Sequence, residues 1–209
     1  MVLFEDEPSR TTMRAQHMSD HLAFLERNAH SVRSAGPLVD AVDESGAGGL
    51  WLVEAENLQG CRHSTSQTRF GRPGCANPSG CCDGTRSSLT GGALRDAKTH
   101  VPSATEQQMT RWVAIFDDHP ESEAGWIRRR HAQAHFAYLA ENRHKVLLGG
   151  GLRLGPEEWY CGGLWVIEVD SRDEAVALCE NDPYFRLGLR KGYSLYVWGK
   201  APCYQEIRL

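Results

Sequence analysis

The sequence has no long apolar run, and none of its apolar stretches approaches the roughly 18 residues that a membrane-spanning helix needs. Its first ten residues, MVLFEDEPSR, are acidic, whereas a secretion signal is basic and then apolar. The net charge of −4 provides no basic excess for a nucleic-acid or membrane surface. We therefore expect a cytoplasmic protein whose partner is a small molecule or another protein.

Motifs for metal and covalent chemistry are also missing. The seven cysteines are an odd number and unevenly placed, so in a reducing compartment we expect mostly free thiols. Cys75, Cys81 and Cys82 lack the paired CxxC spacing of a zinc site, and no HExxH motif is present. No serine or cysteine nucleophile motif is evident. We expect neither a metal nor a cofactor.

The chain does contain an internal repeat. HLAFLERN at 21–28 recurs as HFAYLAEN at 135–142, and GGLWLVEA at 48–55 recurs as GGLWVIEV at 162–169. Both pairs are offset by 114 positions, so no insertion separates the copies between these motifs. The same offset relates two further pairs: Arg14 and His17 to Arg128 and His131.

Each copy has the same order of predicted elements. A short apolar strand (MVLF or RWVAIF) precedes a helix, and two further strands follow, the second of them GGLWLVEA or GGLWVIEV. The apolar spacing predicts these buried helix faces: Met18, Leu22, Leu25, Ala29 and Val32 in copy one, and Ala132, Phe136, Leu139 and Val146 in copy two.

Copy two continues with a second helix and a last strand. Ser171 and Glu174 predict a capping box, and Ala175, Val176, Leu178 and Cys179 form the predicted buried side of that helix. GYSLYVWGK alternates as a strand should. The fold class is therefore α+β, with tandem ferredoxin-like βαββαβ units, the first lacking its second half. The expected domains are an incomplete copy one (1–66), an irregular Gly- and Cys-rich segment and linker (67–108), and a complete copy two (109–209).

The HLAFL helix, the following AGP and the DPYFRLGLR segment resemble the YCII-related domain family. The resemblance implies a dimeric α/β-barrel fold, in which two ferredoxin-like units pack their sheets together. Two copies in one chain would then pair with each other, or with another chain as a homodimer. It also implies a catalytic dyad of a helix histidine and the DP aspartate, which by position are His135 and Asp182 in copy two and His21 in copy one.

The position of the arginine differs from the family pattern, in which it lies three residues before the histidine. Here Arg128 lies seven residues before His135, and Arg14 seven before His21. His131 and His135, like His17 and His21, lie at i and i+4 on one helix face, so either histidine of each pair could face the aspartate. We favour the second of each pair because it opens the HLAFL match. Two such histidines could also bind zinc, but a third ligand is missing.

A His–Asp dyad would suit proton transfer. An imidazole titrates near neutrality, and a carboxylate on one ring nitrogen leaves the other free to act as a base. We predict substrate-binding positions around it at Arg128, His131, Tyr138, Gly150 and Trp165. A purely structural interpretation stays open. In it, His135 lies at the edge of the core, and Asp182 only ends a helix before Pro183.

The segment where copy one should have its aspartate is QTRFGRPGCANPSGCCDGTRSS at 67–88. Low hydrophobicity with Gly, Pro and Ser is typical of a linker. Alternatively, starting at the third base of the Gln67 codon, synonymous codons permit DPFWPAGLRKSVRLLRWNQVFADG, which parallels DPYFRLGLRKGYSLYVWGK of copy two. Residues 57–92 are then either a true linker or a frame-displaced second half of copy one, whose remaining site at Arg14, His17 and His21 is vestigial.

Three functions follow from these observations. The first is a small-molecule lyase or isomerase that uses His135 and Asp182 for proton transfer. The second is a non-catalytic ligand-binding or assembly module on the same barrel. The third, a cysteine-based metal or redox protein, depends on the cysteines of 67–88.

Overall fold

The computed structural model describes residues 1–4, 11–54, 110–155, 157–199 and 201. Its described strands form one seven-stranded antiparallel sheet in the order β1-β3-β2-β7-β4-β6-β5. The strands are β1 (Val2–Phe4), β2 (Val32–Asp40), β3 (Gly46–Val53), β4 (Thr110–Asp118), β5 (Val146–Arg153), β6 (Tyr160–Val169) and β7 (Arg190–Trp198). The helices are α1 (Thr11–Arg27), α3 (Glu121–Glu141), α4 (Arg172–Asn181) and α5 (Pro183–Arg186).

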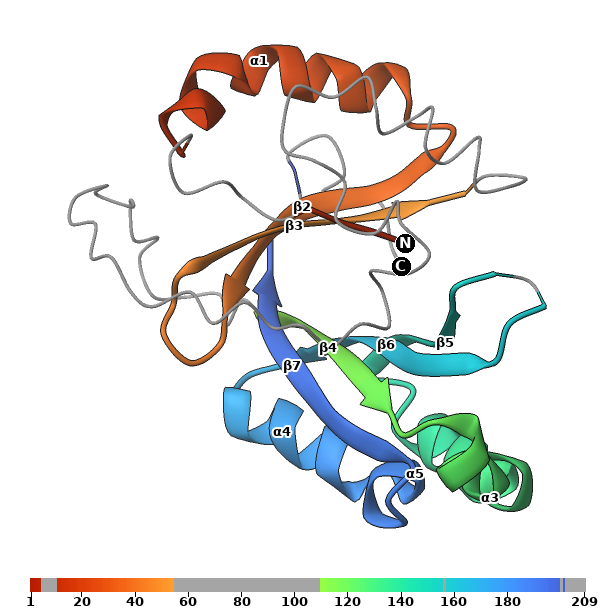
Figure 1. The fold of residues 1–209 in the computed structure, drawn as a ribbon. Helices are drawn as coiled ribbons and strands as arrows, with labels where there is room; N and C mark the ends of the chain where they lie inside the picture. The colour runs from red at the N-terminus through yellow and green to blue at the C-terminus, as the bar shows by residue number, and fades with distance from the viewer. Residues whose placement is uncertain (5–10, 55–109, 156, 200, 202–209) are drawn as a thin grey trace.

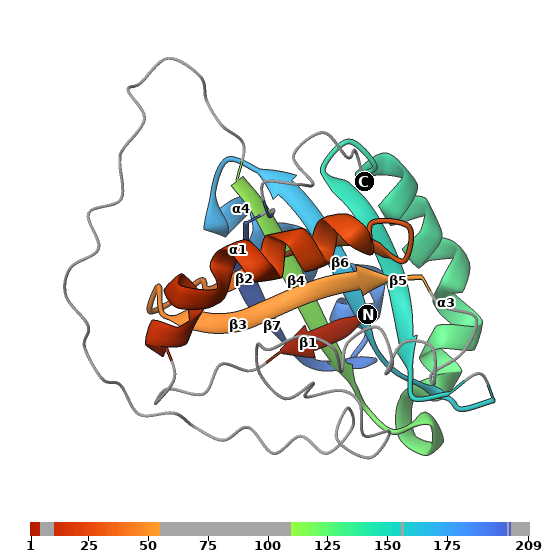
Figure 2. The same cartoon turned by 90° about the horizontal axis from the view of Figure 1, so that it is seen from above.

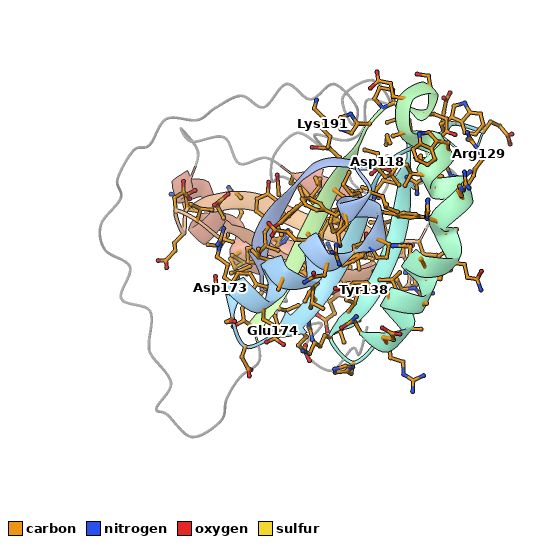
Figure 3. All side chains as sticks on the ribbon, turned by 90° about the horizontal axis from the view of Figure 1, so that it is seen from below. Asp118, Arg129, Tyr138, Asp173, Glu174 and Lys191 are labelled. Atoms are coloured by element: carbon orange, nitrogen blue, oxygen red, sulfur yellow. The ribbon has the colours of Figure 1, made fainter. Side chains whose placement is uncertain are left out.

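The part of the chain from 110 to 199, called here the C-terminal unit, has the βαββαβ order expected from the sequence. Its strands lie in the order β7-β4-β6-β5, and the single-turn helix α5 separates α4 from β7. The predicted capping box is present, because the backbone N–H of Glu174 donates to Ser171 Oγ at 3.2 Å. Asp173 and Glu174 add negative charge to the first turn of α4, where the helix dipole favours it (Figure 3).

Residues 1–54, called here the N-terminal unit, form β1, α1, β2 and β3, in the sheet order β1-β3-β2. Their register matches that of the C-terminal unit. Val32 is paired with Val53, and 114 positions later Val146 is paired with Ile167. Both ladders then shift register at the next step, and the later pairs along each ladder keep the same offset as far as Pro37↔Gly49 and Gly151↔Gly163.

Helices cover the outer faces of the sheet, and Figure 1 shows α1 on one side of the molecule with α3, α4 and α5 on the other. Seen from above, α1 lies over the strands of the N-terminal unit and runs alongside β3 (Figure 2). Between the two helical layers lies an apolar core built by both units. Its buried members are Leu38, Leu50, Val113, Leu164, Val166 and Trp198. The two units therefore bury apolar surface against each other, which is the dominant favourable contribution to folding.

The two units are joined edge to edge through β2 and β7. The ladder pairs Leu38 with Trp198 and Asp40 with Tyr196, and Ala201 N–H donates to Ala35 C=O at 2.8 Å. The β2–β7 ladder thus connects residues of the N-terminal unit to the C-terminal unit within one chain. The backbone approach is close, because a Cβ built on Gly36 would lie 1.5 Å from the Gly199 carbonyl oxygen.

The predicted helix faces were partly wrong. In α1, Leu25 is buried and Leu22 half-buried, but Met18 is 42% exposed, Ala29 follows the end of the helix and Val32 begins β2. In α3, Ala132 and Leu139 are half-buried, Phe136 is 63% exposed, and Val146 belongs to β5. The face of α3 that is buried instead carries Ala124, Ile127 and His135. A polar histidine at a buried position hides this face from a pattern that counts apolar residues only.

Candidate active site

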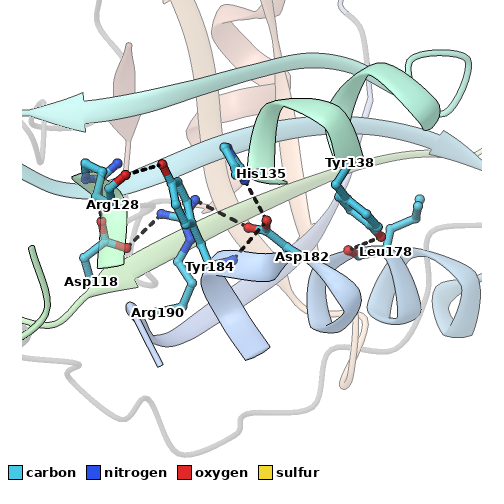
Figure 4. A network of polar contacts seen from close by, with 8 residues as sticks. All are labelled: Asp118, Arg128, His135, Tyr138, Leu178, Asp182, Tyr184 and Arg190. Carbon is cyan, nitrogen blue, oxygen red and sulfur yellow. Dashed lines mark hydrogen bonds and ion pairs between the residues drawn. The ribbon is translucent and has the colours of Figure 1, made fainter. Parts of the chain in front are cut away.

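His135 and Asp182 lie against each other in the interior of the C-terminal unit. The His135 Nδ1 is 2.6 Å from Asp182 Oδ1 (Figure 4). His135 is 6% exposed and Asp182 is fully buried. Because a buried carboxylate needs polar partners, this contact satisfies a requirement of folding as well as any chemical role.

The local sequence around Asp182 explains its position. Asp182 is the C-cap of α4 and also the N-cap of α5, where its Oδ1 accepts the backbone N–H of Tyr184 at 3.3 Å. Pro183 occupies the first turn of α5, a position that suits its fixed φ and missing N–H. Asp182 therefore ends one helix and begins the next, as the interpretation without a catalytic role predicts. The same geometry also aims the carboxylate at α3.

A second carboxylate and two arginines continue this polar network. Arg190, at the start of β7, has Nη2 3.8 Å from Asp182 Oδ2 and donates through Nη1 to Asp118 Oδ1 at 2.8 Å. Arg128 of α3 donates to the other oxygen of Asp118. The side chains of Asp118 and Arg190 are 1% and 3% exposed, so the ion pairs lie in a region of low dielectric.

Asp118 and Arg190 were not among the residues predicted from the sequence. Arg190 ends the DPYFRLGLR segment on which the family resemblance rests, and Asp118 lies in the acidic end of β4. Their contact depends on an irregularity in the β4–β7 ladder, where the register shifts between Asp117 and Asp118 and places Asp118 opposite Arg190. No spacing in the sequence reports that shift.

Aromatic rings enclose the His135 imidazole. Tyr184 stacks on it with centroids 4.0 Å apart and an interplanar angle of 13°, and the Trp165 ring lies 6.2 Å away. The Tyr184 hydroxyl donates to the Arg128 carbonyl at 3.2 Å. Burial raises the pKa of Tyr184, while the charges of Arg128 and Arg190 oppose the increase. Tyr184 therefore remains a neutral phenol at physiological pH, and its ring packs against one face of the imidazole.

The predicted substrate-binding residues differ in how close they lie to the dyad. Trp165 is 1% exposed, and its ring centroid lies 6.2 Å from that of His135. Tyr138 donates its hydroxyl to the Leu178 carbonyl at 2.8 Å, so this donor already has a partner in α4. Burial, followed by the charge of Asp182, raises the pKa of Tyr138 to about 12. Tyr138 is therefore a neutral phenol at neutral pH.

Arg128 lies over the faces of two tyrosines, with its guanidinium carbon 4.6 Å from the Tyr160 centroid and 5.6 Å from that of Tyr184. It thus connects the dyad region to β6. Gly150 is exposed on β5, and a Cβ added there would meet nothing within 4 Å. His131 packs its ring edge-on to Trp126 at 6.2 Å, one helical turn before His135. Of the two histidines on this face, it is His135 that contacts Asp182.

The N-terminal unit repeats part of this arrangement. The His21 ring lies 5.8 Å from Trp51, the same pair of positions as His135 and Trp165 after the offset. His17 points toward Asp20, 3.9 Å away in the same helix. The side chain of Arg14 lies outside the described part, as does position 68, where a matching aspartate was sought.

Three further features of the described residues are their potential metal ligands, the apolarity of their helices and their cysteines. No group of three or more His, Cys, Asp or Glu side chains in that part of the chain could hold a metal ion. None of the helices described has the length and apolarity that crossing a bilayer requires. The Cys161 thiol donates to the Leu152 carbonyl at 3.4 Å, and burial raises the pKa of the Cys179 thiol, which keeps it protonated and unreactive. Cys75, Cys81 and Cys82, together with the whole of 57–92, lie outside the described residues.

This geometry permits one kind of chemistry directly. A carboxylate that accepts Nδ1–H fixes the imidazole tautomer and leaves the Nε2 lone pair available. An imidazole held in this way can take a proton from a bound molecule and return it, with the carboxylate stabilising the cation formed in between.

Three comparisons with known proteins were made for the whole chain. Residues 110–199 match the model of the YCII-related domain. The search of solved structures found a similarity to 5-chloro-2-hydroxyhydroquinone dehydrochlorinase from Burkholderia phenoliruptrix, solved with 2,5-dihydroxybenzoquinone. That similarity has 27% identity and a TM-score of 0.37, and covers 41% of this chain and 89% of the other. A comparison with curated proteins found no match.

Proposed function

We propose that the C-terminal unit is an enzyme of the lyase or isomerase type that transfers a proton on a small-molecule substrate. His135 is the general base, and Asp182 orients it and stabilises its cationic form. The observation that carries the proposal is the 2.6 Å contact between His135 Nδ1 and Asp182 Oδ1 in a buried, aromatic-lined setting. The match of residues 110–199 to the YCII-related domain supports it.

The chemical step consists of two proton transfers. His135 Nε2 takes a proton from a carbon beside a carbonyl, or from a phenol-like ring, and the electron pair left behind is delocalised onto the carbonyl or ring oxygen. The imidazolium then returns the proton to another atom of the substrate, which is isomerisation, or to a departing group, which is elimination. No oxidant, metal or covalent intermediate is needed. Trp165 and Arg128 would flank the bound molecule, with Gly150 and His131 farther out.

The test is exchange of substrate protons with solvent, because it detects the base before the overall reaction is known. The protein is incubated in D2O with a panel of small ketones, lactones, phenols and halogenated hydroquinones, and ¹H NMR follows the loss of exchangeable C–H signals. We expect exchange with wild-type protein and a decrease of about 10²-fold or more for His135→Gln. The matched control is His144→Gln, at an exposed histidine just after the end of α3, which should retain most of the activity.

The alternative is a ligand-binding module without turnover. It is supported by the structural role of the dyad, since Asp182 caps α5 and is a hydrogen-bond partner of His135 whether or not chemistry occurs. Compounds that bind the wild-type protein without any exchange or conversion would favour this alternative. Exchange that is unaffected by His135→Gln would reject His135 as the base.

We further propose that the N-terminal unit is an incomplete copy of the same domain. Three observations support this: the shared order of elements, the β2–β3 and β5–β6 registers related by one offset, and the His21–Trp51 and His135–Trp165 ring pairs. On this proposal Arg14, His17 and His21 are a vestigial site. The nucleotide sequence of codons 55–110 tests the frame-displaced origin of residues 57–92. Codons that cannot encode DPF in any shifted frame would reject that origin.

A further inference from the structure

The buried carboxylate of Asp182 is shared between two cationic or potentially cationic groups. Its Oδ1 lies 2.6 Å from His135 Nδ1, and its Oδ2 lies 3.8 Å from Arg190 Nη2, beyond hydrogen-bond distance. Oδ2 is buried and makes no hydrogen bond within the described part of the chain. The Arg190 guanidinium is thus close enough to act on Asp182 by charge, but does not bind it directly.

Asp118 explains why Arg190 stays at that distance. Arg190 Nη1 donates to Asp118 Oδ1 at 2.8 Å, and Arg128 occupies the other oxygen of Asp118. The guanidinium carbon of Arg190 also lies over the Phe116 ring, 4.6 Å from its centroid. Asp118 is opposite Arg190 because of the register shift in the β4–β7 ladder, so the backbone itself positions this pair.

We propose that Arg190 and Asp118 are positioning residues that set how strongly Asp182 holds a proton on His135. A carboxylate opposed by a nearby guanidinium stabilises an adjacent imidazolium less than an unopposed carboxylate does. Asp118 limits the effect by drawing Arg190 away from Asp182. Arg190 thereby favours the neutral imidazole and Asp118 moderates that effect, a role that rests on the proposed function of the dyad.

Several charged and titratable groups lie in the polar network around the dyad. Those to be considered together are Arg128, His131 and Tyr138 of α3, Cys179 of α4, Asp182 and Tyr184 at α5, Asp118 of β4 and Arg190 of β7. Tyr138, Tyr184 and Cys179 stay neutral in the neutral pH range, because burial raises the pKa of each. The charges that act on His135 are therefore those of the two carboxylates and the two arginines, together with His131.

The inference predicts shifts of opposite sign for two variants of the full-length protein. Arg190→Met removes a cation, so the pH at which His135 is half protonated should rise by about one unit. Asp118→Asn removes an anion and frees Arg190 to approach Asp182, so that pH should fall. The measurement is a histidine side-chain ¹H–¹⁵N NMR titration, with the His135 signal assigned by its loss in His135→Gln.

The matched control is Arg111→Met, which breaks the ion pair of Arg111 with Glu168 on β4 and β6 without touching the dyad. It should leave the His135 titration unchanged. Should Arg190→Met fail to fold, the isosteric Asp118→Asn variant carries the test alone. Shifts of the same sign, or shifts below about 0.2 units in both variants, would overturn the inference.

The NMR readout also separates this inference from the proposed function. If the two variants shift the titration in opposite directions but no compound is turned over, the electrostatic role stands and the enzymatic proposal fails. If turnover exists, the acid limb of its pH profile should move in the same direction as the NMR titration. If the acid limb of the pH profile is unchanged in both variants, Arg190 and Asp118 do not act on the reacting base.

Discussion

Two replacements of Asp182 should separate the contribution of its capping hydrogen bonds to stability from the contribution of its charge. Asp182→Ala removes the N-cap of α5 and the partner of His135, and leaves Arg190 without one of its two carboxylates. Loss of an N-cap costs about 1 kcal/mol. Removing one partner from a buried charged network costs about 3 to 5 kcal/mol in all. We therefore expect the free energy of unfolding to fall by about 3 to 5 kcal/mol in this variant.

Asp182→Asn should be milder, because the asparagine oxygen can still accept the backbone N–H of Tyr184. Asn and Asp are comparable as N-caps, so the part that is lost is the charge. A hydrogen bond to a charged group is worth about 1.5 to 3 kcal/mol, and the amide replaces some of it. We expect a loss of about 1 to 3 kcal/mol, smaller than that of the alanine variant.

Urea unfolding at pH 7, followed by tryptophan fluorescence and circular dichroism together, measures both losses. Coincident transitions and unchanged m values are needed for the comparison. Asp20→Ala, whose carboxylate is 73% exposed, provides the control and should change stability by less than about 0.5 kcal/mol. The reasoning is refuted if Asp182→Ala costs no more than this control, or if the asparagine variant is as damaging as the alanine variant.

Three further outcomes are expected. Because the pKa of Tyr138 is raised to about 12, the folded state must keep this phenol protonated while the unfolded chain ionises near pH 10, so stability falls as pH rises from about 10 to 12. Tyr138→Phe should reduce that loss in alkaline urea titrations, and an unchanged slope would contradict the assignment. Gly36→Ala places a Cβ against backbone at the β2–β7 joint and should cost about 1 to 3 kcal/mol in thermal or urea unfolding, whereas Gly46→Ala, with nothing within 4 Å, should be nearly neutral. Gly150→Ala should fold normally, since its Cβ also meets nothing within 4 Å; weaker binding of a compound found in the exchange screen would place Gly150 at the ligand, and unchanged binding would exclude it.

The elements of the fold could largely be predicted from local patterns. Alternating and apolar runs located β4, β6 and β7, and the capping box at Ser171 located the start of α4, because these signals depend on residues a few positions apart. The buried faces of the helices were harder to predict from the sequence. On α3 a histidine occupies the inward position and Phe136 faces out, so an apolar count selected a face rotated from the buried one.

The candidate site was predictable only in part, for a similar reason. His135 and Asp182 stood out through short motifs and their resemblance to a family. Arg190 and Asp118 did not, since 72 residues separate them and their contact requires a specific ladder irregularity. Tyr184 lies within the DP motif, but its stacking on His135 depends on how α5 meets α3.

By itself, the sequence determined the order of strands and helices in the C-terminal unit, because hydrophobic periodicity is a local property of the chain, while the two residues of the proposed dyad came from the resemblance to a family. Only the tertiary structure decided which edges of the sheet meet, and which charges surround the imidazole. Strand pairing joined β2 to β7, and a shifted register brought Asp118 to Arg190. These contacts depend on distances through space between residues remote along the chain, and the pattern of residue types does not encode them one by one.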